Sequence, residues 1–529
     1  MVSPTEPEKA RKSATGAKPT GNRHTPVDTA PGNRAHWQSP DAKGMPAYPD
    51  RAFLPPPPPR WQRVAYPAGA VSAAGIAGLV AAATLPLDQP GIGWLLAGSA
   101  AAAAVTVVHR RARRAADPER RAPAGPGRGW ERLWWAIAAL ALLAVGTFRA
   151  AGWLFVLCVA AAAVAGSLAV VGRRSAHGIF HDAFAVPLAS FGAVAWAYTA
   201  QGRLRNGTGV RQRRLGVSVA VTVALLAVFV PLLAGADATF AAFVDGLIPR
   251  VDGDTVRRWV LVFLLAGAGS LGALYLLAGT PNPAGETKVP NRTLARLEWG
   301  LPVGALTVVF ALFIAAQLVA LFGGDDYVQR TAGLTYAEYA RGGFWQLSAV
   351  TVLTLAVILP VLHRAARGTA GDRLWLRALL CAISGLTLVI IASALGRMWT
   401  YQQAYGFTVL RVLVSTCELW LGIVYILVIV AVLRLKMSWL PRMTIGTAMA
   451  ALLALAALNP EALIASENID RWQHGKDLDV AYLSGLSADI VPTIDRLPTP
   501  IRTDLRARLE HGLDDDTWNS WNLARARAR

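Results

Sequence analysis

Long apolar stretches separated by short polar segments set the pattern of this chain. A bilayer-spanning helix needs about twenty predominantly apolar residues, and eleven such stretches occur, at 66–85, 91–108, 133–148, 150–171, 216–235, 259–278, 300–322, 344–362, 378–396, 408–433 and 440–458. They are continuous rather than alternating, which favours helices over barrel strands. The pattern predicts an all-α, polytopic integral membrane helix bundle with about 11 transmembrane helices.

Basic residues are distributed unevenly over the segments between these stretches. Lys and Arg number 25 in one set of alternate segments and seven in the other; the first set consists of 109–132, 172–215, 279–299, 363–377 and 434–439, together with Arg442. Cytoplasmic loops are enriched in Lys and Arg, so the first set is predicted to be cytoplasmic. This places the N-terminus in the cytoplasm and, after eleven crossings, the C-terminus on the extracytoplasmic side.

The segment 179–199 is apolar enough to suggest a twelfth crossing. Arg173 and Arg174 precede it, and five further arginines follow between Arg203 and Arg214. A crossing would move those five arginines outside and reverse every later segment. We therefore expect a re-entrant or interfacial helix here, with a kinked twelfth span as the alternative.

Composition divides the chain into four parts. Residues 1–64 are polar and proline-rich and are expected to form a disordered cytoplasmic tail. Membrane helices with basic cytoplasmic loops follow over 65–214, and the remaining transmembrane core covers 215–458. No apolar segment lies near Met1, so we expect the first span, rather than a cleaved signal peptide, to direct insertion.

The last part, 459–529, is expected to be an extracytoplasmic helical tail. It begins with Asn459 and Pro460, which should end the preceding helix. Short amphipathic helices are predicted in this tail, for example one over 477–491, where apolar side chains recur at helical spacing, namely Leu478, Tyr482, Leu486 and Ile490. The final residues, 525–529, are expected to be frayed.

Net charge and cysteines narrow the class of protein. The net charge of +19 comes largely from loop arginines, which favours contact with anionic lipid headgroups of the bilayer over nucleic-acid binding. The three cysteines lie inside apolar stretches, so we expect no disulfides; they are Cys158, Cys381 and Cys417. The richness in Ala, Val, Leu and Arg suggests a bacterial protein of the plasma membrane.

Glu418 is the sharpest candidate for chemistry. It lies ten residues into a span, about 15 Å deep and near the bilayer centre. Charged groups at that depth are costly and often functional. Arg411 lies seven residues earlier on nearly the same face, too far for direct contact within one helix. The alternatives are a substrate or proton site and a buried acid that only fixes helix packing.

Two polar clusters on the predicted outer face are further candidates. One precedes the span at 344 and suits an interfacial helix or a ligand rim; its residues are Tyr336, Glu338, Tyr339 and Arg341. The other precedes the Glu418 span and contains Arg397, Tyr401 and Tyr405. Arg397 departs from the inside bias and so predicts a specific acidic partner, for which the candidates are Glu338, Asp237, Asp325 and Asp326.

Metal, cofactor and enzyme motifs are not found. His177 and His181 have i, i+4 spacing, but Gly178 weakens the helix and no third ligand is near, so an ordinary basic interface is favoured over a metal site. We therefore expect no metal, no cofactor and no catalytic residue, and the balance is against an enzyme.

Several stretches, in this order, resemble a bacterial multi-pass membrane family known as domain of unknown function 4173, with relatives under 4153. They are Ala234–Phe240, Leu321–Gly324, Thr335–Phe344, Arg397–Arg411, Asn459–Ile464 and Leu478–Asp489. The likeness covers roughly 215–492. It implies an integral membrane protein and transfers no activity. The family tends to have a second arginine where this chain has Gly342 and Gly343.

These features favour transport or sensing of a small ligand at the outer face, above Glu418. The alternatives are a membrane scaffold with protein partners at its N- and C-terminal tails and, less favoured, a lipid-modifying enzyme that uses outer acids such as Asp237. The predicted binding residues are Glu418, Arg411, Arg397, Tyr401, Tyr405, Glu338, Arg341, Tyr336, Tyr339 and Asp237.

Overall fold

A computed structural model describes most of the chain. The described residues are 64–115, 128–172, 179–203, 253–279, 293–322, 336–511 and 516–529, with six single positions between 222 and 237. All of them belong to one compact unit, Pro58–Arg529. They form helices, with one isolated β-bridge between Leu294 and Ala365 and no strand. The predicted tail over 1–64 lies outside the described residues except for Val64.

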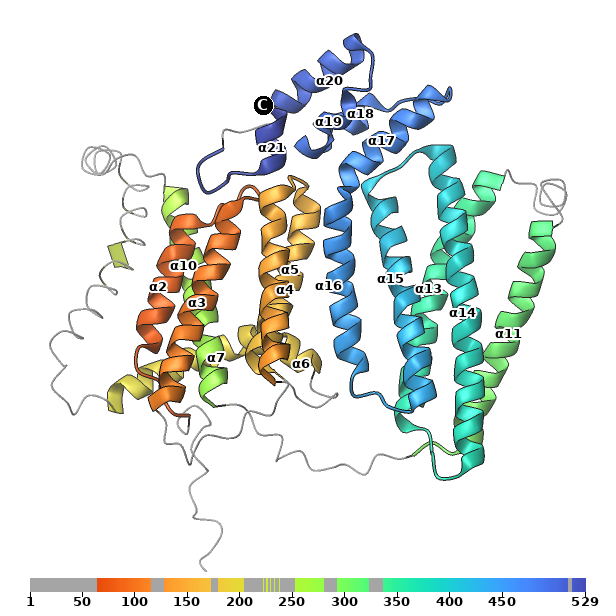
Figure 1. Ribbon diagram of the computed structural model, residues 1–529, viewed down its shortest axis with the longest axis horizontal. Helices are drawn as coiled ribbons and strands as arrows, with labels where there is room; N and C mark the ends of the chain where they lie inside the picture. Colours follow the sequence, from red (N-terminus) through yellow and green to blue (C-terminus); the bar gives the residue numbers. More distant parts are fainter. Residues whose placement is uncertain are drawn as a thin grey trace, which may run out of the picture. The chain divides into compact units, whose positions relative to one another are not determined.

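Nine described helices are long and apolar enough to cross a membrane (Figure 1). They are α3 (Ile92–Ala115), α4 (Arg128–Phe148), α5 (Gly152–Val171), α10 (Gly253–Ala278), α11 (Arg296–Phe322), α13 (Tyr336–Arg364), α14 (Ala370–Tyr405), α15 (Val409–Arg434) and α16 (Leu440–Leu458). Each coincides with a predicted span. The all-α membrane helix bundle is therefore confirmed.

The other two predicted spans are not among these nine helices. The stretch 66–85 forms α2 (Ala70–Thr84), whose 15 residues reach about 22 Å, short of a hydrocarbon core of about 30 Å. Gly69, in the left-handed region with φ of 85°, stands at its N-terminal boundary. The stretch 216–235 lies outside the described residues apart from single positions.

The segment 179–199 forms two helices, α6 (Ile179–Ala183) and α7 (Ala185–Arg203). Trp196 of α7 packs against Tyr275, with ring centroids 5.4 Å apart, and its indole N–H donates to the Val64 carbonyl. These contacts fall on the last turns of α10 and the residues before α2, and Figure 1 shows α7 crossing the helix ends. An interfacial helix would have this placement, and that interpretation stays a prediction.

The helices pack in groups. The first group consists of α2, α3, α7 and α10, and the second of α11, α13, α14 and α15, while α4 and α5 form a pair. The helix α16 contacts both α15 and the α4–α5 pair. At the start of α16, Arg442 forms an ion pair with Glu131 of α4 at 3.2 Å. Helices that are apolar on all faces can bury one face and leave the rest for lipid.

Short helices follow α16 and stack on its end. They are α17 (Pro460–Gln473), α18 (Val480–Ser484), the 3₁₀ turn η5 (Ala488–Ile490), α19 (Val491–Ile494), α20 (Thr499–His511) and α21 (Leu523–Ala528). Asn459 adopts a left-handed conformation between α16 and α17, so α16 ends where the Asn-Pro pair predicts. We call this set the C-terminal helices. The end of the bundle that they cover is called the C-terminal end.

The single amphipathic helix predicted over 477–491 is wrong. The segment is divided because Asp479 caps α18 by accepting from the Tyr482 N–H, and Ser487 caps η5 by accepting from the Asp489 N–H. Short polar side chains that bond nearby backbone groups start and interrupt helices in this way. Leu486 and Ile490 are nevertheless buried, as their spacing implied.

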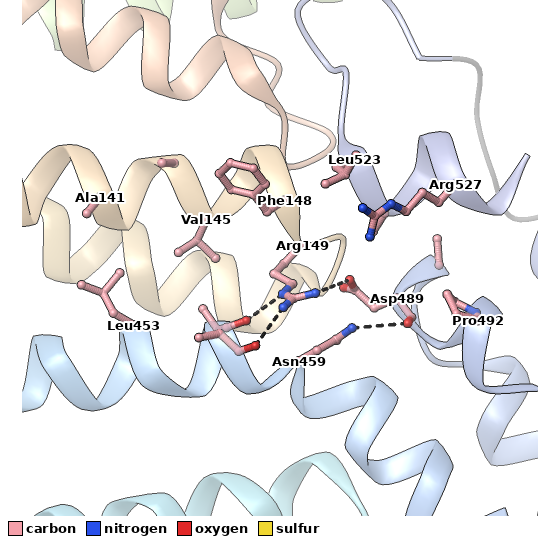
Figure 2. Close-up of a pocket in the computed structure, with 15 residues that line it drawn as sticks. Ala141, Val145, Phe148, Arg149, Leu453, Asn459, Asp489, Pro492, Leu523 and Arg527 are labelled. Carbon is pink, nitrogen blue, oxygen red and sulfur yellow. Dashed lines mark hydrogen bonds and ion pairs between the residues drawn. The ribbon is translucent and has the colours of Figure 1, made fainter.

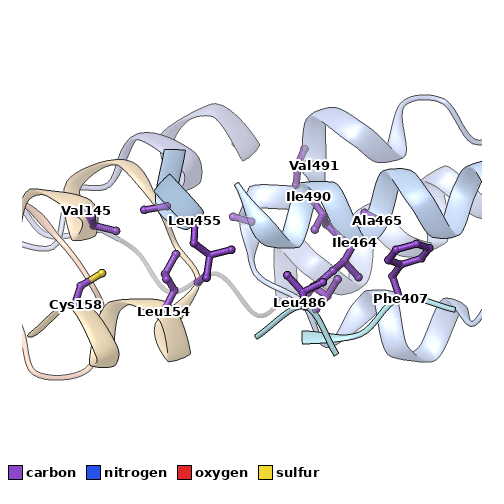
Figure 3. Close-up of a cluster of buried hydrophobic side chains, with 14 of the residues drawn as sticks. Val145, Leu154, Cys158, Phe407, Leu455, Ile464, Ala465, Leu486, Ile490 and Val491 are labelled. Carbon is purple, nitrogen blue, oxygen red and sulfur yellow. The ribbon is translucent and has the colours of Figure 1, made fainter. Parts of the chain in front are cut away.

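One apolar core joins the membrane helices to the C-terminal helices (Figure 3). Leu154, Cys158 and Leu455 contribute from the spans, and Ile464 and Ile490 contribute from beyond them. The base of α17 is tied to α5 because Glu461 accepts from the Trp153 indole N–H at 2.9 Å. The C-terminal helices are thus fixed to the bundle end rather than loosely tethered.

The expectation of a frayed end is also wrong. Arg525 of α21 is buried, and its guanidinium forms an ion pair with Asp516 at 2.7 Å and donates to the Pro90 carbonyl. Asn522, also buried, donates to the carbonyls of Gly146 and Arg149. Buried polar side chains with several partners order a segment that composition alone marks as loose.

Candidate functional site

The turn between α14 and α15 is where the predicted binding residues meet the C-terminal helices. Gly406 follows α14 with φ of 87°, a conformation that L residues rarely adopt. A Cβ atom there would lie 2.9 Å from Asn468 Oδ1 and 3.0 Å from a guanidinium nitrogen of Arg471. The missing side chain lets α17 approach the turn directly.

Asn468 holds this turn through its backbone. Its Oδ1 accepts from the Phe407 N–H at 2.8 Å, and its Nδ2 donates to the Phe407 carbonyl at 2.9 Å. Asn468 is only 8% exposed. Two residues later, the N–H of Val409 donates to the Tyr482 hydroxyl at 2.8 Å. Net contributions of about 0.5–1.5 kcal/mol per bond make this a strong local attachment.

The side chains of two arginines bind the last carbonyl groups of α14. Arg411 donates to the carbonyls of Tyr405 and Gly406, and Arg471 donates to those of Gln403 and Ala404 at 2.9 Å each. The last carbonyls of a helix lack intrahelical partners and carry partial negative charge. Burial and the nearby charge of Arg411 lower the pKa of Arg471 from its usual value. The turn therefore collects two neighbouring cations.

Tyrosines complete the Arg411 environment. Arg411 donates to the Tyr401 hydroxyl at 3.2 Å, and its guanidinium lies 4.3 Å from the centre of the Tyr401 ring. Tyr401 in turn packs on Tyr405 with ring centroids 5.0 Å apart. A cation over an aromatic face adds to the attraction. These contacts bring three of the predicted binding residues together, Arg411, Tyr401 and Tyr405.

A pocket of about 490 Å³ opens beside these groups. Its charged lining comes from Arg411, Arg471, Lys476, Asp477 and Asp479. Three cations face two carboxylates, and Asp479 is already engaged because it accepts from the Tyr482 N–H. The volume suits a small molecule, and the charges suit an anion or a zwitterion. We call this the turn pocket.

A polar stripe descends α15 from the turn pocket. Arg411, Ser415, Glu418 and Tyr425 share one helix face because their spacings are four, three and seven residues. Gln402 of α14 donates to Ser415 at 3.4 Å. The stripe thus begins at the turn pocket and runs between α13 and α14.

Glu418 lies buried within this stripe, 2% exposed. Its Oε2 has no hydrogen-bond partner among the described residues, and Ser348 of α13 lies next to the carboxyl group. Lower down, the Tyr425 hydroxyl donates to the Thr351 carbonyl at 2.6 Å. Arg411 turns its guanidinium toward the helix end, so Glu418 is not its partner. A buried carboxyl with an unused oxygen can take up a proton or meet a polar ligand.

Of the other predicted binding residues, neither Arg397 nor Asp237 lines the turn pocket. Arg397 is half-buried on α14, one turn before Tyr401. Asp237 is exposed at one of the single described positions. The cluster at 336–341 forms the first turns of the continuous helix α13, rather than a separate interfacial helix. The side chains of that cluster lie outside the described residues, as do Asp325 and Asp326.

Sequence reasoning missed the half of the turn pocket contributed by the C-terminal helices. Asn468, Arg471 and Tyr482 lie more than sixty residues beyond the turn, and no local period marks such pairing. Among the described residues, no group of three His, Cys, Asp or Glu side chains could hold a metal ion. His181 is exposed, and His177 lies outside the described residues. All three cysteines are free.

Comparison with known proteins identifies a family. Residues 137–497 match the family described as a domain of unknown function, DUF4153. The match begins well before residue 215, so it includes most of α4 and all of α5 as well as the turn pocket. No curated protein and no solved structure matches the chain. With more than half of its length matched, the chain belongs to the DUF4153 family.

Proposed function

We propose that this protein binds a small anionic or zwitterionic ligand in the turn pocket, for transport or sensing. The proposal includes a bacterial plasma membrane, a cytoplasmic N-terminus and an extracytoplasmic C-terminal end. The observation that carries it is the polar stripe, which connects the cations of the turn pocket to Glu418 inside the bundle. A scaffold would need neither the excess cations nor a buried carboxyl with an unused oxygen.

Lys476 provides the sharpest test of binding. Its side chain lines the turn pocket and is exposed, so Lys476→Glu should reverse a charge without disturbing the fold. Lys436→Glu is the matched control, since Lys436 is exposed at the opposite end of α15. Phosphate, glutamate and citrate are suitable probes, read by the rise in unfolding temperature of the purified protein.

The wild type and the Lys436→Glu variant should be stabilised by at least one probe. The Lys476→Glu variant should bind that probe about tenfold more weakly, because one charge-assisted contact has become repulsive. Equal stabilisation of all three proteins would contradict binding in the turn pocket. Binding in the turn pocket would also be contradicted if none of the three probes stabilised the wild type.

A Glu418 variant distinguishes the transport hypothesis from the sensing hypothesis. Transport predicts that liposomes containing the protein accumulate the bound probe. In Glu418→Gln, accumulation should fall while binding persists, because the amide cannot exchange a proton. Sensing predicts binding without accumulation in either protein. A Glu418→Gln variant with unaltered uptake would assign Glu418 to helix packing alone.

A further inference from the structure

A second pocket, of about 440 Å³, lies between the last turns of α4 and α16 (Figure 2). One wall is the face of α4 formed by Ala141, Val145 and Phe148, and the facing wall contains Leu453 and Ala456 of α16. Several of the lining side chains are alanines, which leave space between the two helices at this level. Both walls belong to apolar helices that qualify as membrane spans, so the lower part of this pocket is hydrocarbon-like.

The upper part of the same pocket is cationic. Arg149, directly after α4, and Arg527 of α21 both line it. Figure 2 shows both guanidinium groups at the end nearest the C-terminal helices, beyond the side chains of Ala141, Val145 and Leu453. The pocket therefore changes from apolar to positively charged along its length.

Arg149 is held in place by other groups. Its guanidinium donates to the carbonyls of Ala456 and Ala457, at 2.6 and 3.0 Å, where α16 ends. A third contact, 3.9 Å long, joins it to the carboxylate of Asp489. A cation fixed this way keeps its position without a ligand, as binding sites with low reorganisation cost require.

The single carboxylate in this pocket is already engaged. Asp489 Oδ2 accepts from the N–H groups of Ala150 and Ala151, at 2.7 and 3.0 Å, and from the Ser487 hydroxyl. Arg527 has no hydrogen-bond or ion-pair partner among the described residues. The pocket thus holds two guanidinium groups against one carboxylate, an excess of positive charge at the end of two membrane helices.

We propose that this pocket holds one anionic phospholipid. Its phosphate lies between Arg149 and Arg527, and the first part of an acyl chain lies along Ala141 and Leu453. Guanidinium groups bind phosphate oxygens with charge-assisted hydrogen bonds. Basic pockets between membrane helices suit anionic lipid headgroups. The volume accommodates a headgroup and the start of its chains rather than a whole lipid, so the remainder lies in the bilayer.

The test uses the full-length protein reconstituted in phosphatidylcholine discs, with or without dioleoyl phosphatidylglycerol. After transfer to a neutral detergent, native mass spectrometry counts the phosphatidylglycerol molecules retained per protein. Arg527→Glu should reduce retention about tenfold, the expected effect of turning one charge-assisted contact into repulsion. Arg506→Glu is the control, because Arg506 is exposed on α20 and lines neither pocket.

A second pair of variants tests the apolar part. Ala141→Trp should fill the space along α4 and also reduce retention about tenfold, a loss within the range for blocking a packed apolar contact. Ala163→Trp adds the same bulk at an exposed position of α5 that does not line the pocket, so it should leave retention unchanged. Unfolding temperatures in pure phosphatidylcholine, equal to that of the wild type, establish that each variant is folded.

Competition experiments distinguish a lipid phosphate from the phosphate of a soluble compound. Competition by glycerol 3-phosphate or inorganic phosphate should be weak, because neither fills the apolar part. Release of the lipid by either soluble anion at equal concentration would assign the site to a free phosphate compound and overturn the lipid proposal. Retention by Arg527→Glu or Ala141→Trp equal to that of the wild type would overturn it as well.

Discussion

At the scale of single residues, the C-terminal end is organised by backbone groups that need partners. Asn468, Tyr482 and Asp489 each bond N–H groups at the start of a membrane helix or in the turn before it. Arg149 and Arg411 bond carbonyls at the ends of others. Helix ends expose such unpaired groups, so the same residues that shape the two pockets also attach the C-terminal helices to the bundle.

Gly406 tests this attachment most directly. Gly406→Ala forces a Cβ into a left-handed backbone and within 2.9 Å of Asn468 Oδ1, and should lower the free energy of unfolding by about 1–3 kcal/mol. Thermal unfolding of the purified protein measures the loss. Gly396→Ala is the matched control, because a Cβ there meets nothing within 4 Å and α14 should tolerate alanine. Equal unfolding temperatures for both variants would contradict the close approach.

Asp489 makes stability depend on pH. Burial raises the pKa of its carboxyl group above the ordinary value, although the N–H groups of Ala150 and Ala151 and the charge of Arg149 oppose the shift. A raised pKa in the folded state means that protonated Asp489 favours folding. This contribution is complete below the unfolded-state pKa of 3.8 and is lost as pH rises through the folded-state pKa.

Comparison with the Asp489→Asn variant isolates the contribution of Asp489 protonation to the free energy of unfolding. The stability of the wild type relative to the variant should fall as pH rises across that window and then become constant. Unfolding temperatures of both proteins, measured across the acidic range, give the difference. A difference that rises with pH would show that the hydrogen bonds and Arg149 outweigh burial.

At the scale of elements, α21 shows how a short helix is fixed without a large apolar face. Its six residues are too few for a stable isolated helix. Asn522 caps it by accepting from the Arg525 N–H, and the Arg525 side chain pairs with Asp516. Both side chains of that pair are 6% exposed, so the ion pair is shielded from solvent.

Breaking this pair should be costly. Arg525→Ala leaves Asp516 largely buried beside only the more distant Arg529, and such loss of one partner costs about 3–5 kcal/mol. Arg506→Ala removes an exposed partner of Glu510 on α20 and should cost about 0–1 kcal/mol. Limited proteolysis of the folded protein, with chymotrypsin cutting at Trp518 or Trp521, should be faster in Arg525→Ala alone. Equal cleavage rates would contradict the role of the pair.

At the scale of the whole molecule, the sequence predicts the spans better than the sites. Twenty-residue apolar runs specify membrane helices by a local property, and within the described part of the chain nine of them form long helices. Arg411, Tyr401 and Tyr405 lie within ten residues of one another, so their contact was predictable. Asn468 and Arg149 find partners 61 and 307 residues away, and such pairing follows from the packing of the completed fold rather than from any periodicity.

Sidedness is the property on which both proposed sites depend. The described part of α15 runs for 26 residues, about 39 Å, between the turn pocket and the loop that contains Lys436. Glu510 of α20 therefore lies at one end of the bundle, and Lys436 lies at the other. The distribution of Lys and Arg predicts that the Lys436 loop is cytoplasmic, and on that prediction the C-terminal helices should face outward.

Cysteine labelling in intact cells measures on which side of the membrane each end of the bundle lies. The native cysteines lie within membrane helices, so all three are replaced by alanine before a single new thiol is introduced. A membrane-impermeant maleimide should label Glu510→Cys in intact cells, and Lys436→Cys only after the cells are permeabilised. Both positions are exposed, so access to each depends on the membrane alone. The reverse pattern would place both pockets at the cytoplasmic surface, where the turn pocket would meet metabolites and the lipid site the inner leaflet.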